Sequence, residues 1–183
     1  VYFNDDLFPM LPIKPTDFFR DGKCFLGMSH HLFAWDMFKK ICRNSDRLAR
    51  QLLGRRRSLC FLRPQHICTP MFKSECMEVY SKMPAEIAKT AASRVRDEHN
   101  LNQYLFLDYM YLKGKIINER ISKKHFSVGV VSASKLRKFI TQPTHKMACI
   151  NDVQLTEERY EELRRVQIEA FEELFPNKSK FEK

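Results

Sequence analysis

Two short segments of the chain end in Asn-Asp directly after apolar residues. Val-Tyr-Phe leads into Asn4, Asp5 and Asp6, and Met-Ala-Cys-Ile leads into Asn151 and Asp152. In open α/β sheets, ligands bind beyond the carboxyl ends of the strands, so acidic residues at strand ends are placed for a site. Carboxylates are the protein ligands that Mg²⁺ or Mn²⁺ takes, with phosphate oxygens and water completing the shell. The residues alone leave two interpretations open, a divalent cation site or two ordinary Asn-Asp turns.

One histidine stands in a segment rich in polar and turn-forming residues. Arg-Pro-Gln-His ends at His66, and the following seven residues run to Lys73. A histidine can act as a general base because its pKa lies near the working pH. The residue pattern does not distinguish this histidine from its competitors, which are His30, His31, His99, His125 and His145.

Two arginines lie just before a predicted helix. Ser-Arg-Val-Arg places Arg94 and Arg96 two residues apart, upstream of Asn100. The forked guanidinium group suits phosphate oxygens, and a nearby helix N-terminus adds partial positive charge. The alternative is a pair of surface arginines that form ordinary salt bridges.

The composition indicates a globular chain with an anionic partner. At 183 residues, with 44% hydrophobic and 30% charged residues, the chain can bury a core and is predicted to form one domain. The net charge of +10 suggests nucleic acid, an acidic membrane surface or a phosphate-bearing substrate. Nine basic residues and one acidic residue lie between Lys39 and Arg63, whereas the C-terminal segment is rich in glutamate. The six cysteines form no C-x-x-C pair and are predicted to be free thiols.

Strand and helix signals alternate along the chain, which predicts an α/β fold with a Rossmann-like sheet flanked by helices. No apolar stretch is long enough to span a membrane, and no basic leader precedes the first residues. The chain begins inside an apolar run, so we expect the sheet to be incomplete at the N-terminus. The expected strands are 1–4, 115–121, 126–131 and 146–150, and the expected helices start near His31, Ser74, Pro84, Asn100 and Thr156, with Gly54 and Gly114 as stops.

Several of these segments, taken in order, resemble the conserved blocks of one family. They resemble the Stealth-type sugar-phosphate transferases, which include bacterial capsular and exopolysaccharide phosphotransferases and the animal N-acetylglucosamine-1-phosphotransferase of lysosomal targeting. Each block is short, but their common order from residue 2 to residue 183 makes the joint signal specific. The blocks are YFNDDLF with PIKPTDFF, then HICTPMFK, SRVR ahead of NLNQY, CIND, and FPNKSKFEK.

The resemblance implies transfer of a sugar-1-phosphate from a nucleotide sugar to a hydroxyl group of an acceptor glycan, with release of a nucleoside monophosphate. It implies that Asp6 and Asp152 bind Mg²⁺ or Mn²⁺, that Arg96 holds the transferring phosphate, and that His66 deprotonates the acceptor. A bacterial cytoplasmic location is implied, at the inner face of the membrane if the association is peripheral. The remaining expected substrate-binding residues are Asn4, Asp5, Arg94, Asn151 and Lys73.

The chain departs from the family pattern in two places. The family has an aspartate four residues after the arginine, where this chain has Asn100. The first block, a Thr-Trp-Val-Asp strand that helps to hold the nucleotide, is absent. We therefore expect residues 1–183 to be the C-terminal portion of a single catalytic domain that is inactive by itself.

Two other functions remain as alternatives. A metal-dependent glycosyltransferase would transfer the sugar alone and release a nucleoside diphosphate. A nucleic-acid-binding module would use the basic segment from Lys39 to Arg63, although no recognised nucleic-acid motif is present and no nucleic-acid partner is expected. The sugar, the nucleotide base and the acceptor are not determined by the sequence.

Overall fold

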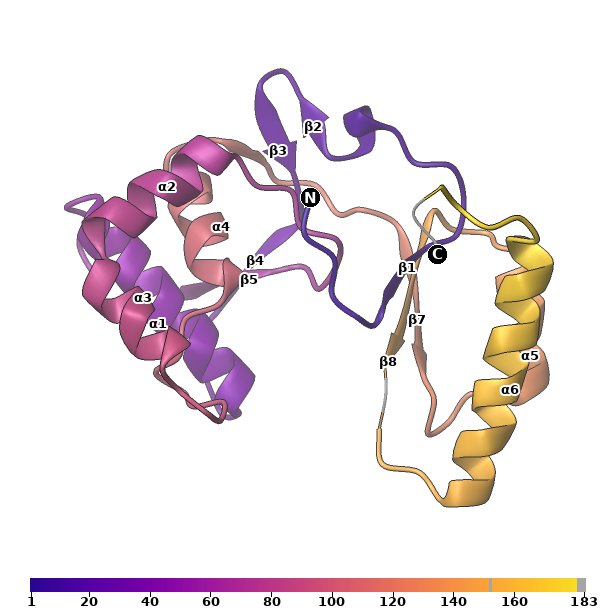
Figure 1. Cartoon of the computed structure of the whole chain (residues 1–183). Coiled ribbons are helices and arrows are strands. Elements are labelled where there is room, and N and C mark those ends of the chain that lie inside the picture. The colour runs from indigo at the N-terminus through magenta and orange to yellow at the C-terminus, as the bar shows by residue number, and fades with distance from the viewer. Residues whose placement is uncertain (152, 181–183) are drawn as a thin grey trace. The chain divides into compact units, whose positions relative to one another are not determined.

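The computed structural model describes residues 1–151 and 153–180 and has an α/β fold, as predicted (Figure 1). By backbone proximity the chain divides into two compact units. The first unit comprises Val1–Tyr2 and Lys14–Ile121, and the second comprises Phe3–Ile13 and Ser122–Lys183. That residues 1–183 belong to a single catalytic domain stays a prediction.

The second unit is a three-stranded sheet with two helices. Its strand order is β1-β8-β7, in which β1 is antiparallel to β8 and β7 is parallel to β8. Helix α5 connects the two parallel strands, which makes the βαβ unit typical of Rossmann-like folds. The elements are β1 (Leu7–Pro9), β7 (Lys123–Ser127), α5 (Ala133–Thr141), β8 (Met147–Asn151) and α6 (Glu157–Leu174).

Apolar side chains of alternate strand residues form the core of this unit. Ala148 and Ile150 of β8 are buried with Leu136 of α5 and Leu163 of α6, whose side chains are almost fully inaccessible. The helices begin at polar caps: Thr156 Oγ1 accepts a hydrogen bond from the amide of Arg159, as the sequence predicted for α6. The core therefore holds α5 and α6 against the sheet and keeps the β7–α5–β8 connection in place.

The first unit contains four α-helices and two small sheets. Helix α1 packs against α4, and α2 packs against α4 as well. One sheet has the order β2-β3-β6, and the other is the antiparallel pair β4-β5. The elements are η1 (Pro15–Asp17), β2 (Phe19–Arg20), β3 (Lys23–Phe25), β4 (Met28–His31), α1 (Met37–Leu52), β5 (Phe61–Pro64), α2 (Lys73–Lys82), α3 (Pro84–Ala91), α4 (Gln103–Leu112) and β6 (Ile116–Ile117).

The prediction that residues 1–4 end a buried strand was wrong. Val1, Tyr2 and Phe3 are 51%, 47% and 40% exposed, and Tyr2 makes only an isolated antiparallel bridge with Thr69. The strand β1 begins after the acidic residues, because the amide of Leu7 closes a turn onto the carbonyl of Asn4. Asp5 and Asp6 therefore precede a strand.

Helix starts were predicted less accurately than helix ends. Helix α1 begins at Met37 because residues 28–31 pair with β5, and the side chain of Asp36 caps its first turn. Helix α2 has Phe72 as its N-cap instead of Ser74, and α4 begins after Asn102 instead of Asn100. The predicted stops are confirmed, since both glycines lie at positive φ, 62° for Gly54 and 71° for Gly114.

Two buried carboxylates meet between α1 and α4. Asp108 is fully inaccessible, and neither of its carboxylate oxygens has a hydrogen-bond partner among the described residues. Asp46 is 3% exposed and accepts a hydrogen bond of 2.7 Å from Nε of Arg50. Burial, and then the negative charge of Asp46, raise the pKa of Asp108 well above its ordinary value. There is thus a pH range in which the Asp108 carboxyl is protonated in the folded chain and ionised in the unfolded chain.

We predict that Asp108→Asn flattens the dependence of stability on pH. The folded chain binds the Asp108 proton more tightly than the unfolded chain does. The contribution of Asp108 to the free energy of unfolding therefore falls as the pH rises above the ordinary pKa of an aspartate, by up to about 1.4 kcal/mol per pH unit. Asparagine has no such proton to lose. Urea unfolding at about pH 5 and about pH 7 measures the difference, with the exposed Glu119→Gln as a control. An Asp108→Asn protein with the wild-type pH dependence would contradict this assignment.

Candidate active site

Asp6 lies where the antiparallel ladder of the second unit continues beyond β1. Leu7 is opposite Cys149, and the amide of Ile150 donates a hydrogen bond of 2.9 Å to the carbonyl of Asp6. The side chain of Asp6 is half-buried, and the neighbouring Asp5 is exposed. The ladder thus places the N-terminal acidic segment beside the C-terminal half of β8.

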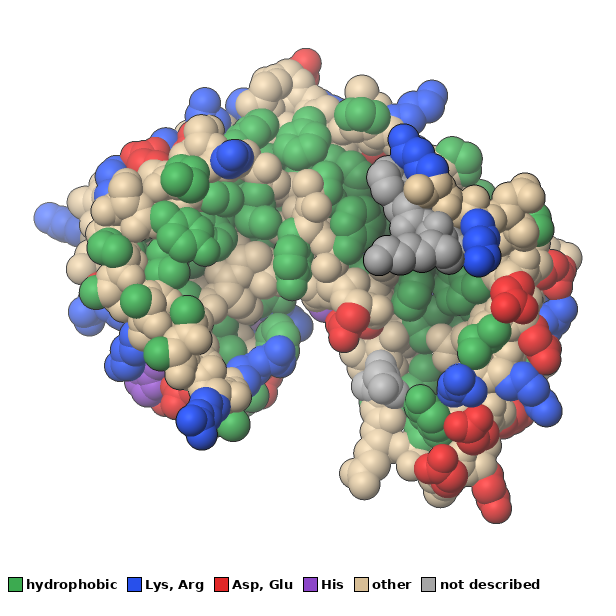
Figure 2. All heavy atoms as spheres, viewed as in Figure 1, with side chains coloured by type: hydrophobic (Ala, Val, Ile, Leu, Met, Phe, Trp, Pro, Cys, Tyr) green, Lys and Arg blue, Asp and Glu red, His purple; other side chains and the backbone are tan. Residues whose placement is uncertain are grey.

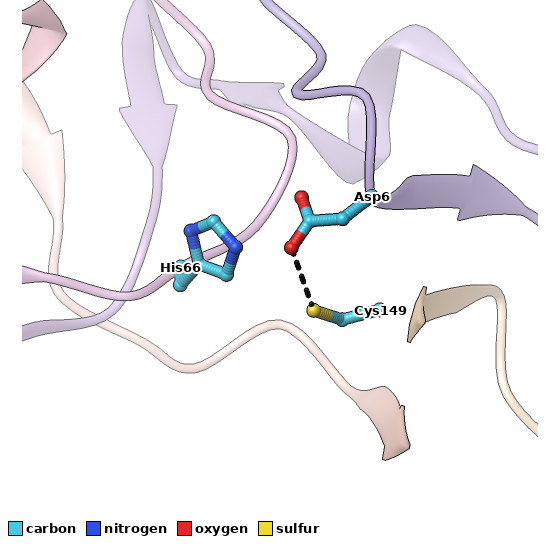
Figure 3. Close-up of side chains that lie close together, drawn as sticks. All are labelled: Asp6, His66 and Cys149. Carbon is cyan, nitrogen blue, oxygen red and sulfur yellow. Dashed lines mark hydrogen bonds between the residues drawn. The ribbon is translucent and has the colours of Figure 1, made fainter. Parts of the chain in front are cut away.

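Cys149, on the neighbouring strand, is a side-chain partner of Asp6. Its Sγ donates a hydrogen bond of 3.3 Å to Oδ2 of Asp6, as the dashed line in Figure 3 marks. Burial first, and the bond to Asp6 second, raise the pKa of Cys149 to about 12. The thiol therefore stays protonated at neutral pH and acts as a hydrogen-bond donor that orients the carboxylate. The sequence did not single out Cys149, because a cysteine in an apolar strand has the appearance of a core residue.

The carboxyl ends of the two parallel strands lie at the same end of the sheet as Asp6. Ser127, the last residue of β7, is opposite Asn151, the last residue of β8. Asn151 is half-buried, and its carbonyl accepts a hydrogen bond of 3.2 Å from the amide of Val128. Asp152 follows directly but lies outside the described residues. The position of Asn151 agrees with the expectation for a strand-end site, whereas the role of Asp152 stays a prediction.

His66 belongs to the first unit and lies in the segment between β5 and the bridge at Thr69. This segment is fixed from both sides. The Gln65 side chain donates to the carbonyl of Ile121 over 2.7 Å and accepts from its amide over 3.0 Å. Thr69 exchanges two backbone hydrogen bonds with Tyr2, of 2.8 and 2.7 Å. The half-buried His66 is therefore carried by a short, well-anchored loop.

Gln65 is a positioning residue that the sequence did not predict. Its side chain forms the same two hydrogen bonds to Ile121 that a neighbouring β-strand would form. Ile121 lies 56 residues away in the sequence, so the residues around Gln65 do not indicate this contact. Gly27 makes room for it, because a Cβ at Gly27 would approach Oε1 of Gln65 to 2.9 Å.

The loop from Ala92 to Asn102 carries the two arginines. Arg94 and Arg96 are both exposed, and the Arg96 guanidinium lies over the ring of Phe38, 5.3 Å from its centroid. Side chains of α1 hold the loop: Lys40 pairs with Glu98 at 2.6 Å, and Asn44 donates to the carbonyl of His99 at 3.2 Å. The arginines thus project from an anchored loop of the first unit.

Asn100 closes this loop instead of capping α4. Its Oδ1 accepts from the amide of Asp97 at 2.8 Å, and its Nδ2 donates to Oγ of Ser93 at 2.9 Å. The Ser93 hydroxyl in turn donates to the carbonyl of Lys89. An aspartate, which only accepts, cannot make both bonds. The helix cap is Asn102, whose side chain accepts from the amide of Tyr104 at 2.9 Å.

The other predicted residues have simpler surroundings. Lys73 is exposed and is the first residue of α2. Asn4 is half-buried, and its carbonyl accepts from Leu7 in the turn before β1. The structure brings Asn4, Asp5, Asp6 and Asn151 to one end of one sheet, and it places Lys73, Arg94 and Arg96 in the first unit.

The largest cavity among those described in the second unit does not match the predicted chemistry. It measures about 530 Å³ and lies between the sheet and α6. Phe8, Ile150, Leu163 and Phe171 give it mainly apolar walls, which do not suit a phosphate-bearing ligand.

We predict that Asn100→Asp lowers the free energy of unfolding by about 0.5 to 1.5 kcal/mol, because the donor to Ser93 is lost. The matched control is Asn102→Asp, two residues away. Its side chain only accepts a hydrogen bond, and aspartate caps a helix as well as asparagine does, so we expect no loss of stability. Urea unfolding of both variants measures the difference. Equal stability of the two variants would contradict the role given to Asn100.

Comparison with known proteins finds bacterial polysaccharide phosphotransferases among the relatives of the chain. The chain is 24% identical to the capsular polysaccharide phosphotransferase WcwK of Streptococcus pneumoniae, with all of this chain and 64% of the relative aligned. It is 26% identical to the receptor polysaccharide phosphotransferase WefC of Streptococcus gordonii, with 100% and 63% aligned. It is 28% identical to the exopolysaccharide phosphotransferase CpsY of Mycobacterium tuberculosis, with 83% and 30% aligned.

The chain spans less than two thirds of the length of these relatives. No family model matches it. Among the described residues, no helix is long and apolar enough to cross a membrane. Matches that extend over the whole chain nevertheless agree with the ordered blocks seen in the sequence. The chain is therefore related to the bacterial capsular and exopolysaccharide phosphotransferases, the Stealth-type family that its sequence resembles.

Proposed function

We propose that the protein transfers a sugar-1-phosphate from a nucleotide sugar to a hydroxyl group of an acceptor glycan in capsule or exopolysaccharide synthesis. The observation that carries this proposal is the ladder between β1 and β8, which sets Asp6 beside the strand that leads to Asp152. The names of these three relatives, which are polysaccharide phosphotransferases, support the same chemistry. In the reaction, the acceptor oxygen bonds to the sugar-linked phosphorus, and the bond from that phosphorus to the bridging oxygen breaks.

Asp6 and Asp152 hold a divalent cation in this proposal, Mg²⁺ or Mn²⁺. The residues fit such an ion because a half-buried carboxylate with a fixed orientation is a hard oxygen ligand. The bound cation would supply neutralisation of the diphosphate charge. Cys149 orients the Asp6 carboxylate through its thiol hydrogen bond, so that Oδ2 faces the Cys149 thiol. Asn4, Asp5 and Asn151 surround this end of the sheet and bind the donor.

Arg96 binds the transferring phosphate, assisted by Arg94 and Lys73. All three side chains are exposed, as residues that bind an incoming ligand must be. The fork of a guanidinium group fits two phosphate oxygens at once, and phosphoryl transfer depends mainly on such positioning. The anchoring of the 92–102 loop by Lys40 and Asn44 supports this role, because it restricts where the arginines can reach.

His66 accepts the proton of the acceptor hydroxyl as the new bond forms. The anchoring of its short loop supports this role, because the hydrogen bonds of Gln65 and Thr69 restrict where the imidazole can lie. A general base in this position typically adds on the order of 10² to 10⁴ in rate.

The acceptor and the location follow from the same proposal. The protein acts in the bacterial cytoplasm on a glycan acceptor, at the inner face of the membrane. Nucleic acid is not a substrate, and the high positive charge serves anionic ligands such as the nucleotide sugar.

Product analysis of the full-length protein tests the proposal. We expect incubation with nucleotide sugars, an acceptor glycan and Mg²⁺ or Mn²⁺ to release a nucleoside monophosphate and leave a phosphodiester in the product. Replacement of His66 by alanine removes the general base, so turnover should fall by about 10² to 10⁴ while folding is retained. His145→Ala is the matched control, because His145 is also half-buried and lies after α5, and it should keep wild-type turnover.

Three results would each overturn the proposal or one of its residue assignments. Release of a nucleoside diphosphate, with no phosphodiester formed, would identify a glycosyltransferase that passes on the sugar alone. Wild-type turnover of His66→Ala would exclude this histidine as the base, and wild-type turnover of Asp152→Asn would exclude Asp152 as a ligand of the cation.

A further inference from the structure

One surface of the first unit exposes large apolar side chains among arginines. Its apolar members are Leu32, Phe33, Trp35 and Leu59, which are 52%, 58%, 74% and 91% exposed. Its basic members are Arg43 and Arg57, both exposed. We call these six residues the apolar-basic patch, and we propose that this patch binds an anionic membrane surface.

The strand pairing explains why residues far apart in sequence form one patch. Strands β4 and β5 are antiparallel, and His31 is opposite Phe61 at one end of the pair. The chain leaves β4 at that end through Leu32, and it enters β5 at the same end after Leu59. Both segments are exposed, so their apolar side chains are presented together at the end of the β4-β5 pair.

Arg43 of α1 ties the two segments together. Its guanidinium donates a hydrogen bond of 2.8 Å to the carbonyl of Leu32 and lies 5.3 Å from the centroid of the Phe61 ring. Arg43, Arg57 and Leu59 also line one small cavity of about 200 Å³. The patch is therefore a defined surface, with its arginines beside its apolar side chains.

The acidic groups near the patch are few and paired. Asp36 forms a salt bridge of 3.2 Å with Lys39, and Asp46 is buried against Arg50. The net field of the patch is therefore positive. Asp and Glu side chains gather instead along α6 in the second unit (Figure 2). Complementarity of charge thus selects an anionic partner for the patch.

The apolar members select a lipid surface among anionic partners. Tryptophan and phenylalanine favour the boundary between lipid headgroups and acyl chains, and arginines beside them attract anionic headgroups. Phe33 and Trp35 already stack on each other, with ring centroids 4.9 Å apart. Leu32 and Leu59 offer no ring on which a base could stack, so half of the apolar set would have no function in binding single-stranded nucleic acid. All four side chains can insert between lipids.

Trp35 provides a direct probe, because it is the only tryptophan of the chain. We expect vesicles of phosphatidylcholine with phosphatidylglycerol to shift its emission to shorter wavelength, protect it from iodide quenching, and carry the chain down in sedimentation. Vesicles of phosphatidylcholine alone should have little effect, and added salt should weaken the binding. The measurement needs no substrate and does not depend on the proposed transfer reaction.

Matched variants locate the binding surface. Arg57→Gln should weaken binding to the anionic vesicles by about fivefold, and Leu59→Ser by about tenfold. Lys89→Gln on α3 and Val130→Ser, which is 87% exposed in the second unit, are the corresponding controls and should bind as the wild type does. Circular dichroism confirms that each variant is folded.

Several outcomes would overturn the proposal. One is the absence of any shift or sedimentation with anionic vesicles, and another is equal binding to vesicles without phosphatidylglycerol. Trp35 emission that is shielded before lipid is added would mean that a protein segment or a second copy covers the patch. Tighter binding to single-stranded oligonucleotides than to vesicles would assign the patch to nucleic acid.

Discussion

The antiparallel pairing of β1 with β8 is the interaction on which the candidate site depends. It joins residues 143 positions apart, through the amide of Ile150, the carbonyl of Asp6 and the thiol of Cys149. A strand register is specific because a slip by one residue turns every side chain to the opposite face. Here such a slip would move Asp6 away from Cys149 and expose the apolar side chains of β1. The burial of Leu7 and Ile150 therefore also fixes where the carboxylate lies.

The first unit positions its residues in a different way, by side-chain amides that form hydrogen bonds to other parts of the chain. Gln65 pairs with both polar groups of Ile121, and Asn100 bonds to Asp97 and Ser93 across its own loop. An amide is suited to this work because one group donates and the other accepts. Loops held in this way can carry His66, Arg94 and Arg96 without belonging to a helix or strand. A strand pairing thus positions Asp6, whereas loops anchored by side-chain amides carry His66, Arg94 and Arg96.

Much of the fold follows from local sequence, and two of the misses reflect partners that lie outside the helix concerned. Thr156, Gly54 and Gly114 were predicted correctly because a cap depends on a few neighbouring residues. The helix expected from His31 begins later, since pairing with β5 removes residues 28–31 from it. Of two asparagines that could cap α4, Asn100 bonds to the Ser93 hydroxyl in its own loop, which leaves Asn102 as the cap. Partners outside the helix decided both cases.

In the candidate site, too, some residues could be predicted from the sequence and others only from the folded chain. Residue types and their order pointed to Asp6, His66 and Arg96, and the ladder placed Asp6 at the end of a sheet, although before a strand and not after one. Cys149 and Gln65 were missed because their function is to hold other residues, and only the folded backbone shows what they hold. A hydrogen-bonding side chain in an apolar or turn-rich context gives no such signal in a single sequence.

The central claim is that the carboxylate of Asp6 holds a divalent cation at the sheet end. Electron paramagnetic resonance of Mn²⁺ added to the full-length protein tests it most directly, because bound and free Mn²⁺ give different signals. The exposed Asp21, at a positive φ that asparagine also tolerates, supplies the control. We expect wild type and Asp21→Asn to bind Mn²⁺ and Asp6→Asn to lose it. Equal Mn²⁺ binding by Asp6→Asn and wild type would contradict the account.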